Sequence, residues 1–327
     1  MPSSSLALSV VIPAYNAAAT LPDLLEALAK QTVPASDFEV LIVDDGSTDA
    51  TAEIAHRAGV RVISQQNQGP ASARNHGARE AHGKIVVFTD SDCAPDPGWL
   101  AAMAAPFDDP EVMGVQGAYR TEQTALAARF AQLEFEDRYD LMRCYPTIDL
   151  VATYAAAFPR AIFLRMGGFD TSFPKANNED TEFSYRLVAA GYKLVFADGA
   201  IVRHLHPDTV MEYLRIKFSR AYWRLIVYRR YPEKAVKDRY TTKMVKLQTL
   251  AAAAAIGALV LSPLAPELFC ASLVLFAGIM ASATPLAKRA QADAPLARAC
   301  FPLVLGRSIV FAVGSLWAVF DMLRKKR

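Results

Sequence analysis

A nearly uncharged stretch close to the C-terminus constrains this chain more than any other feature. Across residues 247–284 the only charged side chain is Glu267, which follows Pro266. A helix needs about 20 predominantly apolar residues to cross a bilayer, so the stretch is too long for one crossing and fits two crossings joined by a tight turn. We therefore expect membrane helices over about 247–263 and 267–284.

A third apolar run, residues 300–323, contains Arg307. Basic residues flank the three runs, namely Lys243, Lys246, Lys288, Arg289 and 324–327. The positive-inside rule places such flanks in the cytoplasm, and the last flank agrees only if the third run does not cross. The third helix is therefore either spanning or interfacial, and the charge pattern favours an interfacial or re-entrant helix. We expect a multi-pass protein of the cytoplasmic membrane whose N-terminal part lies on the cytoplasmic face.

The net charge of +2 averages over segments of opposite sign. Residues 1–202 carry 26 acidic and 15 basic side chains, whereas residues 203–246 carry 4 acidic and 12 basic ones. In residues 207–246 aromatic side chains alternate with the basic ones, and Tyr and Trp prefer the membrane interface. Juxtamembrane Lys and Arg attract anionic lipids. We expect a basic amphipathic neck over 207–246 that meets an anionic membrane surface, followed by a membrane region over 247–327, and no nucleic-acid partner.

Residues 1–206 alternate between strand and helix patterns and are predicted to form one domain. Apolar and β-branched runs predict strands at Leu8–Ile12, Val40–Val43, Val60–Ile63, Ile85–Phe88 and Tyr192–Ala197. Helical spacing predicts helices at Thr20–Gln31, from Asp49 to about Arg57, at Ala71–Ala81, over 120–145 and at Glu179–Ala190. This alternation is typical of an α/β fold with a doubly wound, mostly parallel sheet, which binds ligands at the carboxyl ends of its strands. The four cysteines show no metal-binding spacing and are expected to be reduced.

Two acidic clusters follow predicted strands. Asp44-Asp45 precedes Gly and Ser, so its carboxylates can accept hydrogen bonds from a base or a ribose, or can simply cap the next helix. Asp90-Ser-Asp92 offers two hard carboxylates that suit Mg²⁺ or Mn²⁺, although short acidic pairs are also common in turns.

Three further segments carry candidate groups. Arg74 follows a Gly-Pro turn at the start of a predicted helix, an arrangement that suits a diphosphate or a plain surface loop. Glu179 and Asp180 begin another helix, where carboxylates favour the helix dipole and can also supply a general base. His204 and His206 alternate along a predicted strand, so both would point to one face, and a histidine near Asp92 would be a further metal ligand.

Taken in order, these segments resemble family 2 glycosyltransferases with the GT-A fold. The resemblance rests on Val11-Ile-Pro-Ala-Tyr-Asn16, Val43-Asp-Asp-Gly-Ser47, Asn67-Gln-Gly69, Ala73-Arg-Asn75, Asp90-Ser-Asp92, Gly167-Gly-Phe-Asp170 and Glu179-Asp180. It covers residues 8 to about 206, and the tail resembles the family only loosely. Each motif is weak by itself, whereas the ordered set is specific.

The resemblance implies a role for each matching residue. Pro13, Tyr15 and Asn16 would line the nucleotide pocket, and Asp44 or Asp45 would recognise the base. Arg74 would lie near the diphosphate. The divalent cation, Mg²⁺ or Mn²⁺, would be held by Asp92 and His204 with Asp90 nearby, and Asp180, beside Glu179, would be the base.

The reaction implied is inverting transfer of a sugar from a nucleotide-diphosphate sugar to a hydroxyl of a lipid-linked or cell-envelope glycan. Processive relatives carry a Gln-x-x-Arg-Trp motif, whereas the comparable stretch, residues 218–224, lacks the Gln and reverses the Arg-Trp order, which favours a non-processive enzyme. Two alternatives stay open. One is a polyprenyl-phosphate glycosyltransferase, which usually lacks the Glu-Asp motif; the other is a non-catalytic protein that binds nucleotide-sugars.

Overall fold

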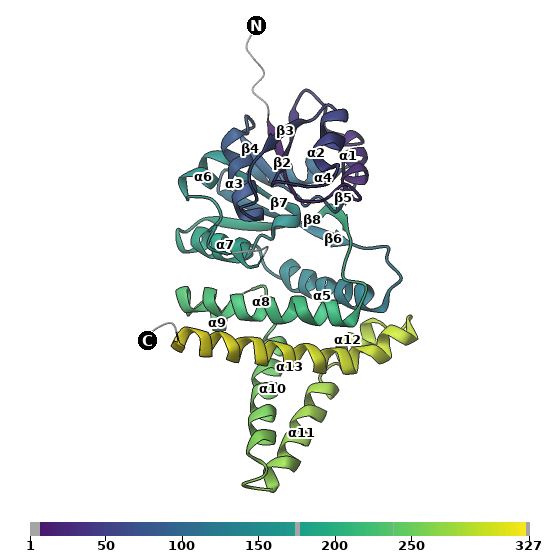
Figure 1. Ribbon diagram of the computed structural model, residues 1–327, viewed down its shortest axis with the longest axis vertical. Helices are drawn as coiled ribbons and strands as arrows, with labels where there is room; N and C mark the ends of the chain where they lie inside the picture. The colour runs from purple at the N-terminus through teal and green to yellow at the C-terminus, as the bar shows by residue number, and fades with distance from the viewer. Residues whose placement is uncertain (1–6, 174–176, 238, 325–327) are drawn as a thin grey trace. The chain divides into compact units, whose positions relative to one another are not determined.

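The computed structural model describes residues 7–173, 177–237 and 239–324 (Figure 1). Its contacts divide the chain into two compact units. The first unit is Met1–Glu122 with Met142–Leu205, and the second unit is Gln123–Leu141 with His206–Arg327.

The first unit is built on an eight-stranded sheet with the order β3-β2-β1-β4-β7-β6-β8-β5 (Figure 1). The strands are β1 Leu8–Ala14, β2 Phe38–Asp44, β3 Arg61–Ser64, β4 Ile85–Phe88, β5 Cys93–Pro95, β6 Val112–Arg120, β7 Ala156–Pro159 and β8 Lys193–His204. The first four strands pair in parallel, whereas β7 is antiparallel to both β4 and β6. Strand β6 is parallel to β8, and β5 is antiparallel to β8. The sheet is therefore mixed, and the sequence predicted its four parallel strands β1–β4 together with the first part of β8.

Strand β1 shows why the parallel half is readable from the sequence. All seven of its residues are buried, because strands of this kind are covered on both faces and read as continuous apolar runs. The later strands β5, β6 and β7 were not predicted. In β6 two glycines interrupt the apolar pattern, and a Cβ added at Gly117 would lie 2.5 Å from the carbonyl oxygen of Ala200. Close approach of the chain at that point requires glycine and removes the usual strand signal.

The helices of the first unit are α1 Leu21–Ala29, α2 Thr51–Arg57, α3 Pro70–Glu80, α4 Trp99–Ala104, α6 Arg160–Arg165 and α7 Glu179–Ala189, with short 3₁₀ turns η1 Ala105–Asp108 and η2 Thr153–Ala155. Of these, α1, α2, α3 and α7 coincide with predicted helices, whereas α4 and α6 were not predicted. Five phenylalanines join α6 and α7 to the sheet, namely Phe88, Phe158, Phe163, Phe169 and Phe183, with neighbouring ring centroids 5.0–6.3 Å apart. Their edge and tilted contacts are favourable aromatic geometries and fix the start of α7 against the sheet.

In the part of the chain that the structure describes, the second unit consists of helices. They are α5 Leu126–Arg143, which continues into the first unit at its last two residues, α8 Val210–Arg230, α9 Lys234–Lys237, α10 Lys243–Leu261, α11 Glu267–Ala281, α12 Thr284–Arg289 and α13 Ala294–Arg324. Three stretches are long and apolar enough to cross a membrane: Lys243–Leu261, Glu267–Arg289 and Ala294–Arg324. Helices thus coincide with all three apolar runs of the sequence, and α10 and α11 form a hairpin (Figure 1).

The contacts of α5 differ from the expected domain organisation. The sequence assigned this helix to the first domain because it lies before residue 206. In the structure its apolar residues Ala127, Phe130 and Ala131 are buried in the core of the second unit. A helix joins the unit that covers its apolar face, whatever its position in the chain. The division into a catalytic domain over 1–206, a neck at the membrane interface over 207–246 and a membrane region over 247–327 stays a prediction.

Candidate active site

The acidic pair Asp44-Asp45 at the end of β2 accepts hydrogen bonds from the neighbouring loops. The Asp44 carboxylate accepts a hydrogen bond from the backbone nitrogen of Ser47 (3.0 Å). The Asp45 carboxylate accepts from the backbone nitrogens of Gln68 and Gly69, both at 2.9 Å, and from the side chain of Gln65. Both carboxylates are buried. Asp45 therefore ties the loop before α3 to the end of β2, a contact that sequence reasoning had not foreseen.

The three residues expected to line a nucleotide pocket lie at the end of β1. Pro13 is buried in the strand, and Tyr15 just beyond it is 52% exposed. Asn16 has φ +49°, in the left-handed region, and its side-chain oxygen accepts a hydrogen bond from the backbone nitrogen of Thr48 (2.8 Å). The ends of β1 and β2 are adjacent because the two strands pair in parallel in register up to Ala14 and Asp44.

Arg74 connects two motifs that lie far apart in the sequence. It projects from α3, is 2% exposed, and donates to Asp90 Oδ1 (2.5 Å) and to Glu179 Oε1 (3.1 Å). One guanidinium thus bridges the Asp-Ser-Asp segment after β4 and the Glu-Asp pair at the start of α7. A planar guanidinium spreads five donors over three nitrogens in a fixed fork, so it can hold two separate carboxylates in a defined geometry, whereas a lysine offers a single nitrogen.

The Glu-Asp pair occupies the first turn of α7, directly after Asn178, whose φ of +64° turns the chain into the helix. Glu179 is buried and accepts a further hydrogen bond from the backbone nitrogen of Asn177 (2.7 Å). Burial, followed by the charge of Asp180, raises the pKa of Glu179 to about 7, against the opposing charge of Arg74. Asp180 is half-buried, and its Oδ1 accepts from the backbone nitrogen of Thr181 (2.6 Å). Of the two acids, Asp180 is the one that keeps access to solvent.

A candidate metal centre lies where β5 meets the end of β8. Cys93 and His204 are directly paired across these strands, and their side chains gather with Asp92 so that one ligand atom of each lies within 4.8 Å of the others. His204 Nε2 lies 3.4 Å from Asp92 Oδ2. Adjacent ligands of an octahedral ion with bonds of about 2.1 Å are separated by about 3 Å, so this carboxylate–imidazole pair fits a hard divalent cation.

Electrostatics and packing both favour this centre. Burial raises the pKa of Asp92, but the hydrogen bond and charge of His204 outweigh it and leave the pKa lowered. The His204 ring stacks on Tyr119 at 4.3 Å between centroids, and Tyr119 stacks on Tyr154 at 3.4 Å. The stack fixes the plane of the imidazole, which metal ligation requires.

His206 is a correction to the sequence analysis. Strand β8 ends at His204, so the strand alternation that would have placed both histidines on one face does not continue. The His206 ring lies in the second unit, where its Nε2 is 3.0 Å from Gln132 Oε1 and its face stacks on Phe135. It is a packed structural histidine.

Sequence reasoning gave no role to three residues that shape the site. Asn75 donates to the carbonyl of Phe169 and accepts from its backbone nitrogen, both at 2.8 Å, and so ties the Gly-Gly-Phe turn to α3. Cys93 belongs to the metal cluster, and Tyr119 supports His204. Adjacency to Asp92 was the only available signal for Cys93, and nothing local marked Tyr119, because it comes from an unpredicted strand.

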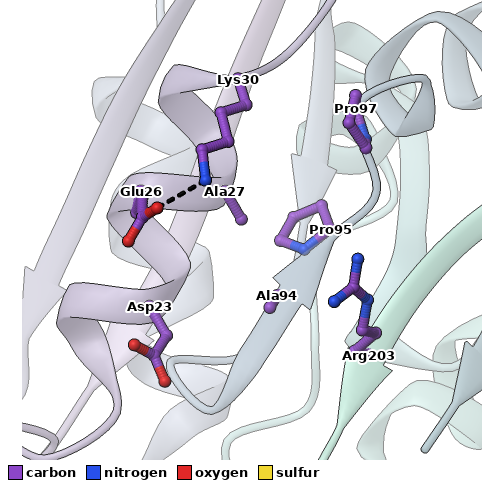
Figure 2. A pocket seen from close by; sticks show the side chains of 8 residues that line it. All are labelled: Asp23, Glu26, Ala27, Lys30, Ala94, Pro95, Pro97 and Arg203. Carbon is purple, nitrogen blue, oxygen red and sulfur yellow. Dashed lines mark hydrogen bonds and ion pairs between the residues drawn. The ribbon is translucent and has the colours of Figure 1, made fainter.

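A cavity of about 280 Å³ lies elsewhere in the first unit, beside α1 and the edge strand β5 (Figure 2). It is lined by Asp23, Glu26, Ala27, Lys30, Ala94, Pro95, Pro97 and Arg203. Ala94 and Arg203 are the strand neighbours of Cys93 and His204, and adjacent strand residues point to opposite faces. Its cations are already paired, Lys30 with Glu26 and Arg203 with Asp96. The cavity is therefore separate from the candidate metal centre.

Comparison with known proteins agrees with this arrangement. Residues 9–165 match the family model described as "Glycosyl transferase family 2". Over these residues the chain belongs to glycosyltransferase family 2. The match includes the ends of β1, β2 and β4 and helix α3, and it stops before Glu179-Asp180 and His204.

Two curated relatives illustrate the similarity. Validoxylamine A glucosyltransferase of Streptomyces hygroscopicus subsp. jinggangensis is 35% identical over 218 residues, which are 56% of this chain and 52% of the relative. Glycosyltransferase AglE of Haloferax volcanii is 31% identical over 210 residues, which are 60% of this chain and 66% of the relative. The chain spans about half of the first relative and just under two-thirds of the second.

Among solved structures, the mannosyltransferase PcManGT from Pyrobaculum calidifontis, in complex with GDP-Man and Mn²⁺, superposes with a TM-score of 0.64. The two chains are 22% identical, and the match covers 95% of this chain and 87% of the other. This likeness confirms the GT-A-like α/β fold of this family 2 chain.

Proposed function

We propose that this family 2 chain is an inverting, metal-dependent glycosyltransferase that moves a sugar from a nucleotide-diphosphate sugar to a hydroxyl of a lipid-linked or cell-envelope glycan. The observation that carries the proposal is the double contact of Arg74. It links the Asp-Ser-Asp segment to the Glu-Asp pair, so the parts needed for diphosphate departure and for acceptor activation lie around one buried cation. The names of a glucosyltransferase relative and of a neighbour bound to GDP-Man support a hexose donor.

In the proposed reaction Asp180 is the general base. The acceptor oxygen forms a bond to the anomeric carbon while its proton passes to the Asp180 carboxylate, and the bond from that carbon to the diphosphate oxygen breaks with its electron pair. In-line attack of this kind inverts the anomeric configuration. Glu179 is buried and faces Arg74, so the acceptor hydroxyl does not reach it.

Asp92 and His204 are the residues that would hold Mg²⁺ or Mn²⁺, and such an ion supplies positive charge for the departing diphosphate when bound. The lowered pKa of Asp92 keeps that carboxylate ionised and available as a ligand. Pro13, Tyr15 and Asn16 are the proposed lining of the nucleotide pocket, with Asp44 and Asp45 toward the base. Arg74 is placed to act through Asp90, which is close to the diphosphate in this proposal.

The proposal includes attachment to the cytoplasmic membrane, with the first unit on the cytoplasmic face. Three helices apolar enough to cross a membrane support attachment, and the basic flanks of the apolar runs support the orientation. The basic residues of the neck would meet anionic lipid headgroups.

The test is release of nucleoside diphosphate from a panel of sugar nucleotides by the full chain in membranes, with and without Mn²⁺. Asp180→Asn should lower turnover by about 10²–10⁴-fold while donor binding persists. Asp109→Asn is the matched control, because Asp109 is a surface acid of the first unit paired with Lys193. Full turnover by Asp180→Asn would exclude the proposed base, and donor binding without turnover by the unaltered chain would indicate a binding protein.

A further inference from the structure

The longest apolar helix, α13, is tied to charged helices along its whole length. Just before its first turn, Asp293 pairs with Arg129 of α5. Near its middle, Arg307 pairs with Glu134 of α5. Close to its end, Asp321 accepts a hydrogen bond from Tyr222 of α8 at 2.6 Å. All of these residues belong to the second unit.

Two of the helices that α13 contacts, α8 and α5, carry too many charges to enter a bilayer. Helix α8, which runs beside α13 (Figure 1), carries seven charged residues in 21, and α5 carries seven in 18. Each Lys, Arg or Asp at the centre of a membrane helix costs about 2.5–3.5 kcal/mol on insertion scales. If α13 crossed the bilayer, α8 and α5 packed against it would also have to enter the hydrocarbon core.

The buried cluster of charged and polar side chains around Glu134 holds the middle of α13 against α5 and α8. Glu134 accepts from Lys217 Nζ at 2.6 Å and from the Tyr213 hydroxyl at 2.8 Å, in addition to its pair with Arg307. Burial raises the pKa of Glu134, but Lys217 and Arg307 outweigh burial and lower it to about 2, so this residue stays an anion. Arg307 is held by a permanent charge on a helix that stays outside the bilayer.

The contact of Arg307 with helix α10 indicates independently how deep Arg307 would lie in a membrane that α10 crosses. Arg307 also donates to Gln248 Oε1 at 2.5 Å, and Gln248 lies only two residues after Lys246, at the charged start of α10. Arg307, in contrast, is 13 residues from the start of α13 and 17 from its end. At 1.5 Å per residue a crossing α13 would carry Arg307 about 20 Å from one end and about 25 Å from the other. The contact places it instead at the level where α10 begins.

One face of α13 suits a lipid surface. Five of its exposed apolar residues follow helical spacing and form what we call the apolar stripe: Val313, Leu316, Trp317, Phe320 and Leu323, which are 40–62% exposed, and Val319 beside them is 41% exposed. The opposite face is small where it meets α8, and a Cβ added at Gly314 would lie 2.7 Å from the carbonyl oxygen of Phe218. Small residues let α13 lie close against α8 while the stripe faces outward.

We propose that α13 lies in the plane of the membrane, with the apolar stripe in the headgroup and acyl boundary of an anionic bilayer. Of the three apolar helices in the described residues, α10 and α11 then cross as a hairpin and α13 does not. Helices of this kind combine an apolar face with a charged opposite side, which α8 and α5 supply here. The arrangement also places all three basic flanks of the apolar runs on one side. The inference rests on the membrane attachment proposed above.

The test measures immersion depth by spin labels on the full chain, in vesicles of phosphatidylcholine and phosphatidylglycerol. Labels are introduced one at a time through Val313→Cys and Leu323→Cys on α13, in a background with the four native cysteines replaced by alanine. The matched pair on α10 is Leu250→Cys and Val260→Cys, which has the same spacing of ten residues. All four side chains are exposed, so labelling removes no packing contact.

The expected result is a depth difference of about 15 Å across the α10 pair and under about 5 Å across the α13 pair. A difference of about 15 Å in both pairs would overturn the in-plane helix and leave membrane attachment standing. Equal depths within the α10 pair would overturn the crossing hairpin. Water-exposed labels at all four positions would show that the proposed membrane attachment itself is wrong.

Discussion

At the scale of single residues, the site depends on a few buried charges. Arg74 is fully enclosed and bonded to two carboxylates, so its proposed role is to position acids and not to touch substrate directly. The sequence identified the residue, whereas its partners Asp90 and Glu179 lie 16 and 105 positions away and are visible only in the fold.

Arg74→Lys tests this role. A single ammonium cannot span both carboxylates, and a buried charge without its partner costs about 3–5 kcal/mol. We expect a lower free energy of unfolding, measured by denaturant titration of the intrinsic tryptophan fluorescence in detergent, and a fall in kcat larger than any rise in KM. Arg79→Lys on the exposed side of the same helix is the control, and equal effects of the two substitutions would contradict a bridging role.

The raised pKa of Glu179 predicts that the free energy of unfolding depends on pH. Its pKa is raised from 4.5 to about 7 in the folded chain, so between these values the folded form holds a proton that the unfolded form has lost. Its contribution to stability is therefore present below about pH 4.5 and is lost as the pH rises through 7, on the order of 3 kcal/mol. Glu179→Gln should flatten this part of the pH profile of the unfolding free energy.

Glu111→Gln is the control for that measurement, because Glu111 is a solvent-exposed acid of the same unit. An unaltered slope in Glu179→Gln would show that another group titrates there.

The metal cluster makes a separate prediction about ligand identity. A hard cation prefers the carboxylate and imidazole to the Cys93 thiol, whose pKa burial raises well above its usual value. We expect Asp92→Asn and His204→Ala each to weaken Mn²⁺ binding at least about tenfold, measured by the free Mn²⁺ signal in electron paramagnetic resonance. Cys93→Ser should bind Mn²⁺ normally, and a loss there as large as in Asp92→Asn would make the thiol a ligand.

At the scale of elements, the active-site helices are held by the turn before Phe169. Gly168 has φ +67°, and a Cβ added there would lie 2.4 Å from Asn75 Oδ1. Gly168→Ala combines backbone strain with a clash that separates α3 from the turn. We expect a loss of about 2–4 kcal/mol in the unfolding free energy and weaker activity.

Gly191→Ala is a close control for this substitution. Gly191 has φ +84° and no atom within 4 Å of an added Cβ, so it reports strain alone, about 1 kcal/mol. If both alanine variants lose the same stability, the contact with Asn75 does not matter. The turn was predicted from Gly167-Gly168, but its attachment to α3 was not, because that contact spans 94 positions of sequence.

At the scale of the whole chain, charge and hydropathy divide along the sequence. The acidic first part and the apolar, basic-flanked tail fit the proposed function, in which the chain holds a nucleotide through a cation and meets lipid through its tail. We expect the full chain to stay with membranes in about 1 M salt, which reduces the screening length to about 3 Å, and to need detergent for release. Recovery in the soluble fraction after the salt wash would mean that attachment is electrostatic and that α10–α11 does not cross.

The sequence by itself determined the family, the parallel half of the sheet, most helices of the first unit and the apolar runs of the tail. These features are local or strictly periodic. Buried strands appear as apolar runs, and a helix or an apolar segment can be recognised from about 20 consecutive residues. Only the tertiary structure decided the rest. It joined Asp90 to Glu179 through Arg74, gathered Asp92, Cys93 and His204, removed His206 from the site, and tied α13 to α5 and α8. Each of these depends on contacts between residues distant in sequence, and the mixed strand order that makes them is set by global packing, which no local pattern records.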